Sequence, residues 1–154
     1  MNEIIQEILE SYPAEQRFSL AAMQDMQRRL GYVPREGLTA LAKRLDRPLS
    51  SLYAMASFYK ALSLKPKGKY IIRVCDGTAC HLKGGPLLLD ALIGTLSLSP
   101  GGTTPDGAFS LETVSCLGSC SIAPAMMIGD RYFGKVTMES LHAIIAEYRE
   151  GAAE

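Results

Sequence analysis

The sequence has no excess of charge of either sign. Its 154 residues include 16 lysines and arginines and 16 aspartates and glutamates, so the formal net charge at pH 7 is zero. It also has no run of Lys or Arg, the basic patch that proteins use to bind nucleic acids. The composition therefore argues against a nucleic-acid partner.

Long apolar stretches are missing as well. No stretch approaches the ~18 residues of a membrane-spanning helix, and the N-terminal Met1-Asn2-Glu3-Ile4 lacks the basic and then apolar pattern of a signal peptide. We therefore expect a cytoplasmic protein without direct membrane insertion. In that compartment thiols stay reduced and available to metals.

Motifs for nucleotides and for nucleophilic catalysis are absent too. No G-x-G-x-x-G follows a predicted strand, and the sequence contains no P-loop. The paired glycines Gly84-Gly85 and Gly101-Gly102 are typical of turns. No serine near a cysteine has an acid–base partner at a useful spacing. The chain is therefore not expected to hold a complete active site of its own.

The chain does have four cysteines, which fall in two short pairs. Cys75 and Cys80 form a C-x4-C pair, and Cys116 and Cys120 form a C-x3-C pair. Each pair follows a run rich in β-branched residues, which predicts a strand before each pair. Two strands would then deliver two loops to one end of a sheet, where four sulfurs can converge.

The spacing of the two pairs is compatible with three kinds of chemistry. Structural zinc takes four thiolates, but its usual pairing is the tighter C-x2-C. A [2Fe–2S] cluster has two irons that take two thiolates each, and the wider pairs suit it better. Disulfides need an oxidising compartment, and thioredoxin-type exchange uses a C-x-x-C that is absent here. The spacing favours the cluster, and the alternative is a zinc-stabilised adaptor or binding module without redox activity.

Residues 1–64 are predicted to form a four-helix bundle. Apolar residues recur at helical spacing in four stretches, within residues 4–12, 20–30, 38–45 and 49–62. Pro13 ends the first stretch, Gly31 is a candidate C-cap of the second, and Pro48 begins the fourth. Short helices joined by short turns favour a small bundle. The lysine-rich segment 65–69 is a turn-prone connector, so we place the domain boundary at residue 65.

Residues 65–154 alternate between strand and helix patterns. Strands are predicted at 70–74 and 109–114, with a helix from about Gly85 to residue 96 between them. Gly129-Asp130 predicts a hairpin, and Thr137 is a candidate N-cap of the closing helix. This β-α-β-β-α order, with Pro124 directly before the hairpin, resembles a thioredoxin fold. The fold class is therefore α+β, a helical bundle followed by a thioredoxin-like α/β domain.

Three segments carry a resemblance to a known family over nearly the whole chain. VCDGTACHLKGG at the first pair and VSCLGSCSIAPAMMIGDRYFGKVT at the second are similar to the thioredoxin-like [2Fe–2S] ferredoxins. LGYVPREGLTALAKRLDRPLSSLYAMASFYKAL is similar to the helical domain of that family. The family includes the 24 kDa subunit of respiratory complex I and small subunits of NAD(P)-linked hydrogenases and formate dehydrogenases.

The resemblance implies a cofactor, a function and partners. It implies one [2Fe–2S] cluster, with Cys75 and Cys80 on one iron and Cys116 and Cys120 on the other. It also implies an electron-transfer subunit of a multisubunit NAD(P)H-linked oxidoreductase, which exchanges single electrons with the flavin of a partner subunit. That partner would bind FMN and NAD(P)(H), and the helical bundle would dock on it. Further iron–sulfur or hydrogenase subunits are expected, and such a complex could hold the chain at the periphery of a membrane.

Small residues beside the cysteines are candidates for contacts with the cluster. Where side chains are small, backbone N–H groups can approach the sulfurs, and N–H···S bonds raise a cluster's reduction potential. A helix that begins near Gly85 would also direct its positive end at the first loop. Arg73 and Lys83 are candidates to tune that potential, and we favour the alternative that both are ordinary surface charges. The candidate cofactor-contacting residues are Gly77, Thr78, Ala79, His81, Gly118 and Ser119.

Overall fold

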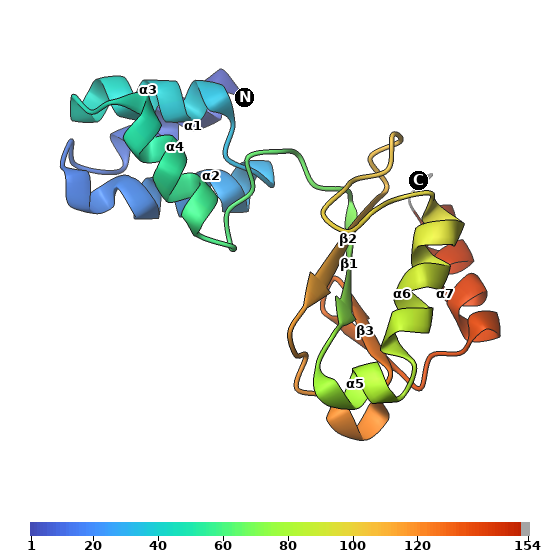
Figure 1. The fold of residues 1–154 in the computed structure, drawn as a ribbon. Helices are drawn as coiled ribbons and strands as arrows, with labels where there is room; N and C mark the ends of the chain where they lie inside the picture. The colour runs from blue at the N-terminus through green and yellow to red at the C-terminus, as the bar shows by residue number, and fades with distance from the viewer. Residues whose placement is uncertain (152–154) are drawn as a thin grey trace. The chain divides into compact units, whose positions relative to one another are not determined.

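A computed structural model of the chain describes residues 1–151 and divides it into two compact units. The first unit is Met1–Pro66 and the second begins at Lys67. In Figure 1 the first unit contains only helices, and the second contains a sheet with helices packed against it.

The first unit is built from four α-helices. These are α1 (Asn2–Glu10), α2 (Ser19–Leu30), α3 (Arg35–Leu45) and α4 (Leu49–Phe58), and a 3-10 helix η1 (Gln16–Phe18) precedes α2. Their apolar stripes face one shared core, in which Met23, Met26 and Val33 are fully buried. Gly31 ends α2 in the left-handed conformation, with φ +79°, as expected of a C-cap glycine.

Two helices of this unit are shorter than their sequence pattern predicts. Helix α1 ends at Glu10, where the Ser11 hydroxyl donates a hydrogen bond to the Glu7 carbonyl oxygen. Helix α4 ends at Phe58, because Tyr59 is extended and starts a turn that returns Leu62 to the core. Burial of Leu62 therefore overrides the helical periodicity that continues to that residue.

The second unit is a four-stranded mixed sheet with two long helices on one face (Figure 1). The strands are β1 (Tyr70–Cys75), β2 (Phe109–Val114), β3 (Ala125–Ile128) and β4 (Arg131–Gly134), in the order β2-β1-β3-β4. Strands β1 and β2 are parallel and the other pairs are antiparallel. Helices α6 (Gly85–Leu96) and α7 (Met138–Glu150) bury their apolar sides against the sheet.

Local signals account for the ends of several of these elements. Gly129 and Asp130 form the two-residue turn of the β3–β4 hairpin, as predicted. Thr137 caps α7 through a capping box with Ser140, in which each side chain accepts a hydrogen bond from the other residue's backbone N–H. The Ala123–Pro124 peptide bond, directly before β3, is cis.

The segment between the first two cysteines differs from the expected loop. It contains the short helix α5 (Thr78–Leu82), in which His81 N–H donates to the Gly77 carbonyl oxygen. A second short element, the 3-10 helix η2 (Cys120–Ile122), begins at the last cysteine. The sequence signal for α5 is weak because a five-residue helix has too few turns to show a periodic stripe.

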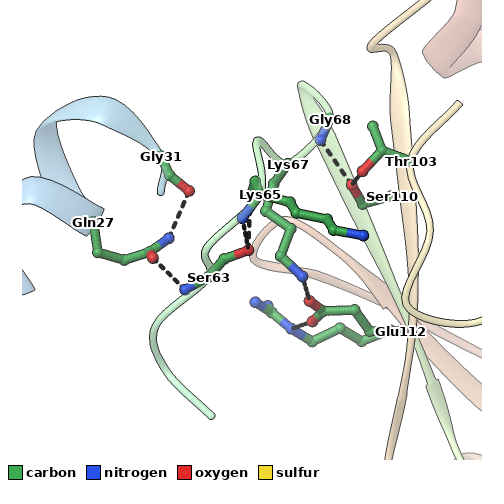
Figure 2. A network of polar contacts seen from close by, with 10 residues as sticks. Gln27, Gly31, Ser63, Lys65, Lys67, Gly68, Thr103, Ser110 and Glu112 are labelled. Atoms are coloured by element: carbon green, nitrogen blue, oxygen red, sulfur yellow. Dashed lines mark hydrogen bonds and ion pairs between the residues drawn. The ribbon is translucent and has the colours of Figure 1, made fainter. Parts of the chain in front are cut away.

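Figure 2 shows polar contacts that hold irregular segments within each unit. In the first unit the Gln27 side chain accepts a hydrogen bond from Ser63 N–H at 2.7 Å and donates one to the Gly31 carbonyl oxygen at 2.6 Å. In the second unit Gly68 N–H donates to the Ser110 hydroxyl at 2.7 Å. These bonds fix the segments that flank the connection between the two units.

Glu112 on β2 pairs with two cations of the second unit. One is Lys67 (Figure 2), and the other is Arg73. Burial raises the pKa of Glu112, but the hydrogen bonds and charges of Lys67 and Arg73 outweigh it and hold this pKa below its ordinary value. A carboxylate whose pKa is lower in the folded state than in the unfolded state stabilises the fold at pH values above its unfolded-state pKa. This stabilisation is lost as the pH falls through the folded-state pKa.

We therefore expect Glu112→Gln to lower the free energy of unfolding by about 1 kcal/mol at pH 7. The difference from the unsubstituted chain should shrink at pH 3, below the ordinary glutamate pKa of ~4.3. Urea unfolding of both chains at the two pH values measures this. Glu150→Gln, an exposed carboxylate of the same unit, is the control, and an equal loss in that variant would contradict the assignment.

Candidate metal centre

All four cysteines lie at the same end of the sheet. Cys75 is the last residue of β1, and Cys80 follows on α5. Strand β2 ends at Val114, which pairs with Cys75 in the parallel register, and Cys116 lies two residues beyond it. Because parallel strands have their carboxyl ends at one edge, the two cysteine-bearing loops start side by side.

The four thiols are free, and the thiols of the first pair lie near those of the second. The Cys75 thiol interacts with the thiols of Cys80 and Cys116, and the Cys80 thiol also interacts with that of Cys120. The backbone of Gly77 lies between the loops, since a Cβ there would be 3.5 Å from Cys75 Sγ and 3.7 Å from Cys116 Cβ. Within residues 1–151, no three His, Cys, Asp or Glu side chains form a ready site for one metal ion.

The centre has a buried side and an exposed side. Cys75 and Cys80 are only 2% and 1% exposed and pack with Ala123 and Ala125 in a small apolar cluster. Cys116 and Cys120 are exposed. The first pair is therefore shielded from water by the protein, and the second pair faces solvent.

Backbone N–H groups point at the sulfurs from both loops. Gly118 N–H donates to Cys116 Sγ at 3.3 Å, and the N–H groups of Gly77 and Leu117 donate to the Cys75 sulfur. Burial raises the pKa of the Cys75 thiol, but these two N–H groups and the neighbouring thiols together lower it below its ordinary value. Such donors stabilise a thiolate, which is the form that binds metal.

Cys80 has the opposite shift. Burial is the main cause that raises the pKa of its thiol, and the neighbouring Cys75 thiol raises it further. The Ala125 N–H, at the start of β3, opposes this as a donor to the Cys80 sulfur. The pKa values of the two neighbouring thiols are therefore shifted in opposite directions.

The remaining candidate contact residues differ in what they touch. Thr78 and Ala79 form the first turn of α5, and Ala79 packs against the apolar cluster of buried cysteines. His81 is exposed, and its Nδ1 lies 3.3 Å from an Asp76 carboxylate oxygen. The Ser119 hydroxyl donates to the Leu117 carbonyl oxygen at 3.5 Å. These polar contacts of His81 and Ser119 therefore go to oxygen atoms.

Sequence reasoning missed Leu117 and Ala125 as donors to sulfur. Their side chains carry no polar group, so residue type gives no signal, and only the path of the backbone brings their N–H groups to the cysteines. The partner of Arg73, one of the two cations considered for tuning the potential, is Glu112.

The N-terminal end of α6 packs directly on the first cysteine pair. A Cβ on Gly85 would lie 2.9 Å from the Cys80 carbonyl oxygen and 3.3 Å from that of Cys75. The positive end of the helix dipole thus lies close to the cysteine backbone, where it favours negative charge. Two thiol pairs, N–H donors from both loops and a helix N-terminus fit a dinuclear cluster with two thiolates on each iron.

The chain matches known proteins over most of its length. The family model for the thioredoxin-like [2Fe–2S] ferredoxins matches residues 5–149. The chain is 38% identical to HndA, an NADP-reducing hydrogenase subunit of Solidesulfovibrio fructosivorans, over 95% of this chain and 85% of the relative. It is 37% identical to an NADH-quinone oxidoreductase subunit of Aquifex aeolicus, over 94% of this chain and 90% of the relative.

Solved structures give the same fold. An NAD+-reducing [NiFe]-hydrogenase in the H2-reduced state aligns with 86% of this chain at a TM-score of 0.69 and 25% identity. The match covers only 22% of that hydrogenase chain, so the similarity is to one segment of a longer protein. None of the helices in residues 1–151 has the length and apolar character needed to span a membrane.

Proposed function

The chain belongs to the thioredoxin-like [2Fe–2S] ferredoxin family, and from this premise we propose its place in a larger enzyme. It is the iron–sulfur electron-transfer subunit of a multisubunit oxidoreductase of the NADH:quinone oxidoreductase or NAD(P)-reducing hydrogenase type. The observation that carries this proposal is the delivery of four free thiols, in two pairs, to one end of the sheet.

We propose that Cys75 and Cys80 bind one iron and Cys116 and Cys120 the other. When bound, the cluster supplies one-electron redox chemistry. The N–H groups of Gly77 and Gly118, with those of Leu117 and Ala125, stabilise the negative charge on the sulfurs. The apolar cluster around the first pair keeps water from that side.

We propose that electrons are exchanged with a partner at the exposed side of the centre, where Cys116 and Cys120 lie. The chain has no nucleotide motif, so the two-electron chemistry of NAD(P)(H) belongs on another subunit. A flavin such as FMN on that subunit would convert two-electron transfer into single-electron steps. We propose that the helical bundle of residues 1–64 docks on that subunit, and that the whole assembly works in the cytoplasm or at the periphery of a membrane.

Metal analysis of the full chain tests the proposal. Protein purified without oxygen should contain two irons and two acid-labile sulfides per chain, and reduction with dithionite should give a spin-half EPR signal. One zinc per chain with no sulfide would contradict it and would favour a structural adaptor.

A further inference from the structure

A groove of about 820 Å³ lies along one side of α4 in the helical unit. Buried Val33 and Leu38 line it together with half-buried Leu49 and Leu64. Tyr53 is the exposed large hydrophobic residue of its lining, with 54% of its surface accessible. A groove with a buried apolar floor and an exposed aromatic residue has the composition of a protein-binding surface.

Hydrogen bonds fix the wall of the groove that is formed by the segment before Lys65. Val33 N–H donates to the Ser63 carbonyl oxygen at 2.7 Å, and Ser63 N–H donates to the Gln27 side chain (Figure 2). The Ser63 hydroxyl donates to the Lys65 carbonyl oxygen. The groove is therefore preformed, so a ligand would not have to order this wall when it binds.

The charges of the groove are of one sign. Arg35 and Lys65 are exposed residues of its lining, and no acidic side chain belongs to that lining. Among residues 1–151, neither of these two side chains forms an ion pair. Arg35 is also the first residue of α3, where the helix dipole disfavours a cation. The neighbouring acidic residue, Glu36, does not line the groove. Two cations without an acidic partner, beside an apolar floor, are complementary to an apolar ligand with carboxylates.

The dimensions of the groove suit a helix. Leu49, Tyr53 and Ser57 line it at intervals of four residues, so the contact stripe runs along nearly all of α4. At a rise of 1.5 Å per residue this stripe is about 12 Å long, which matches about two turns of a second helix packed alongside.

We propose that this groove binds an amphipathic helical segment of another protein in the complex, with acidic residues that pair with Arg35 and Lys65. The proposal rests on the proposed function, because membership of a multisubunit complex supplies the partner. The apolar face of the segment covers Leu38 and Leu49, and its carboxylates lie on either side of that face. Helix-in-groove recognition of this kind uses anchors at helical spacing.

A photo-crosslinker at position 53 tests the proposal in the intact complex. Benzoylphenylalanine replaces Tyr53 in the full chain, the complex is assembled in cells and irradiated, and the cross-linked peptide is sequenced by mass spectrometry. Because Tyr53 is half exposed, the substitution should leave the unit folded. We expect cross-links to one segment of one partner protein, with Asp or Glu within one turn of the attachment site.

A charge reversal tests the role of the two cations. The double variant Arg35→Glu, Lys65→Glu should dissociate from the partner about tenfold faster than the unsubstituted chain. The control is Lys43→Glu, Lys60→Glu, which makes the same change in net charge at exposed lysines outside the groove lining. The dissociation rates of both double variants are measured by binding each purified chain to the partner protein immobilised on a surface.

Three results would overturn the proposal: cross-links to a second copy of this chain, cross-links spread over unrelated proteins or lipid, or equal rates for the two double variants. Iron, sulfide and EPR signal are measured on the same preparations. An intact cluster with a failed groove test rejects the groove alone, whereas a missing cluster rejects the proposed function independently.

Discussion

Replacing Cys80 with serine should remove the cluster, whereas the same replacement at Cys120 should leave part of the iron bound. Cys80 is 1% exposed and packs among alanines, so a serine there would bury a hydroxyl whose ionisation is costly. Cys120 is exposed, so solvent stabilises a charged ligand at that position. We expect iron content in Cys80→Ser to fall at least about tenfold, since even outer-shell changes cost about 10–100-fold in metal affinity.

Iron and acid-labile sulfide per chain, after purification without oxygen, measure the difference between the two cysteine variants. Ser119→Ala is the matched control, because the Ser119 hydroxyl donates to a backbone carbonyl oxygen rather than to a sulfur. This variant should keep the full iron content. Equal iron content in Cys80→Ser and the unsubstituted chain would show that Cys80 is not a ligand.

Gly85→Ala should destabilise the second unit and reduce its iron content, although the change adds a single methyl group. The new Cβ would lie 2.9 Å from the Cys80 carbonyl oxygen and 3.1 Å from the Cys80 carbonyl carbon. Both are backbone atoms that cannot rotate away, so either α6 or the first cysteine loop must shift. Overpacking of this kind costs about 1–3 kcal/mol, and the shift would displace Cys80 from its place beside Cys75.

Gly94 supplies a matched control on the same helix. Apart from its chain neighbours and the backbone of its own helix, a Cβ at this position meets no atom within 4 Å. Gly94→Ala should therefore stabilise α6 by about 0.5–1 kcal/mol through helix propensity alone. The free energy of unfolding, measured in urea, should therefore fall in Gly85→Ala and rise in Gly94→Ala. Only Gly85→Ala should lose iron. A stable, iron-replete Gly85→Ala chain would refute the close packing of α6 on the cysteine loop.

Much of the fold could be predicted because the repeating elements leave periodic signals. Apolar residues at helical spacing marked the four helices of the first unit, and the Gly129-Asp130 turn marked the hairpin. Helix ends were less accurate where tertiary packing decides them, as at Tyr59, which leaves the helix so that Leu62 can be buried. Helix α5 was missed because it is too short to show a period.

The site was only partly predictable, for a different reason. Cysteine spacing shows which thiols are available, and small neighbours such as Gly77 show where the backbone can come close. Neither shows that one pair is buried and the other exposed, because burial depends on the alanines that β3 and the preceding turn bring from later in the chain. The sequence likewise could not identify Leu117 and Ala125 as donors, because a backbone N–H group can donate whatever side chain the residue carries.

Because β1 and β2 pair in parallel, the distance between the two cysteine pairs does not depend on the length of the chain that connects these strands. The register runs without interruption from Tyr70 opposite Phe109 to Cys75 opposite Val114, and it alone sets where Cys116 emerges. The long loop before β2, with its turn at Pro105 and Gly107, lies at the other end of the strands (Figure 1). A tag or a binding loop grafted into that turn would therefore leave the spacing of the two cysteine pairs unchanged, which makes this turn the natural place to attach the chain to a surface or an electrode.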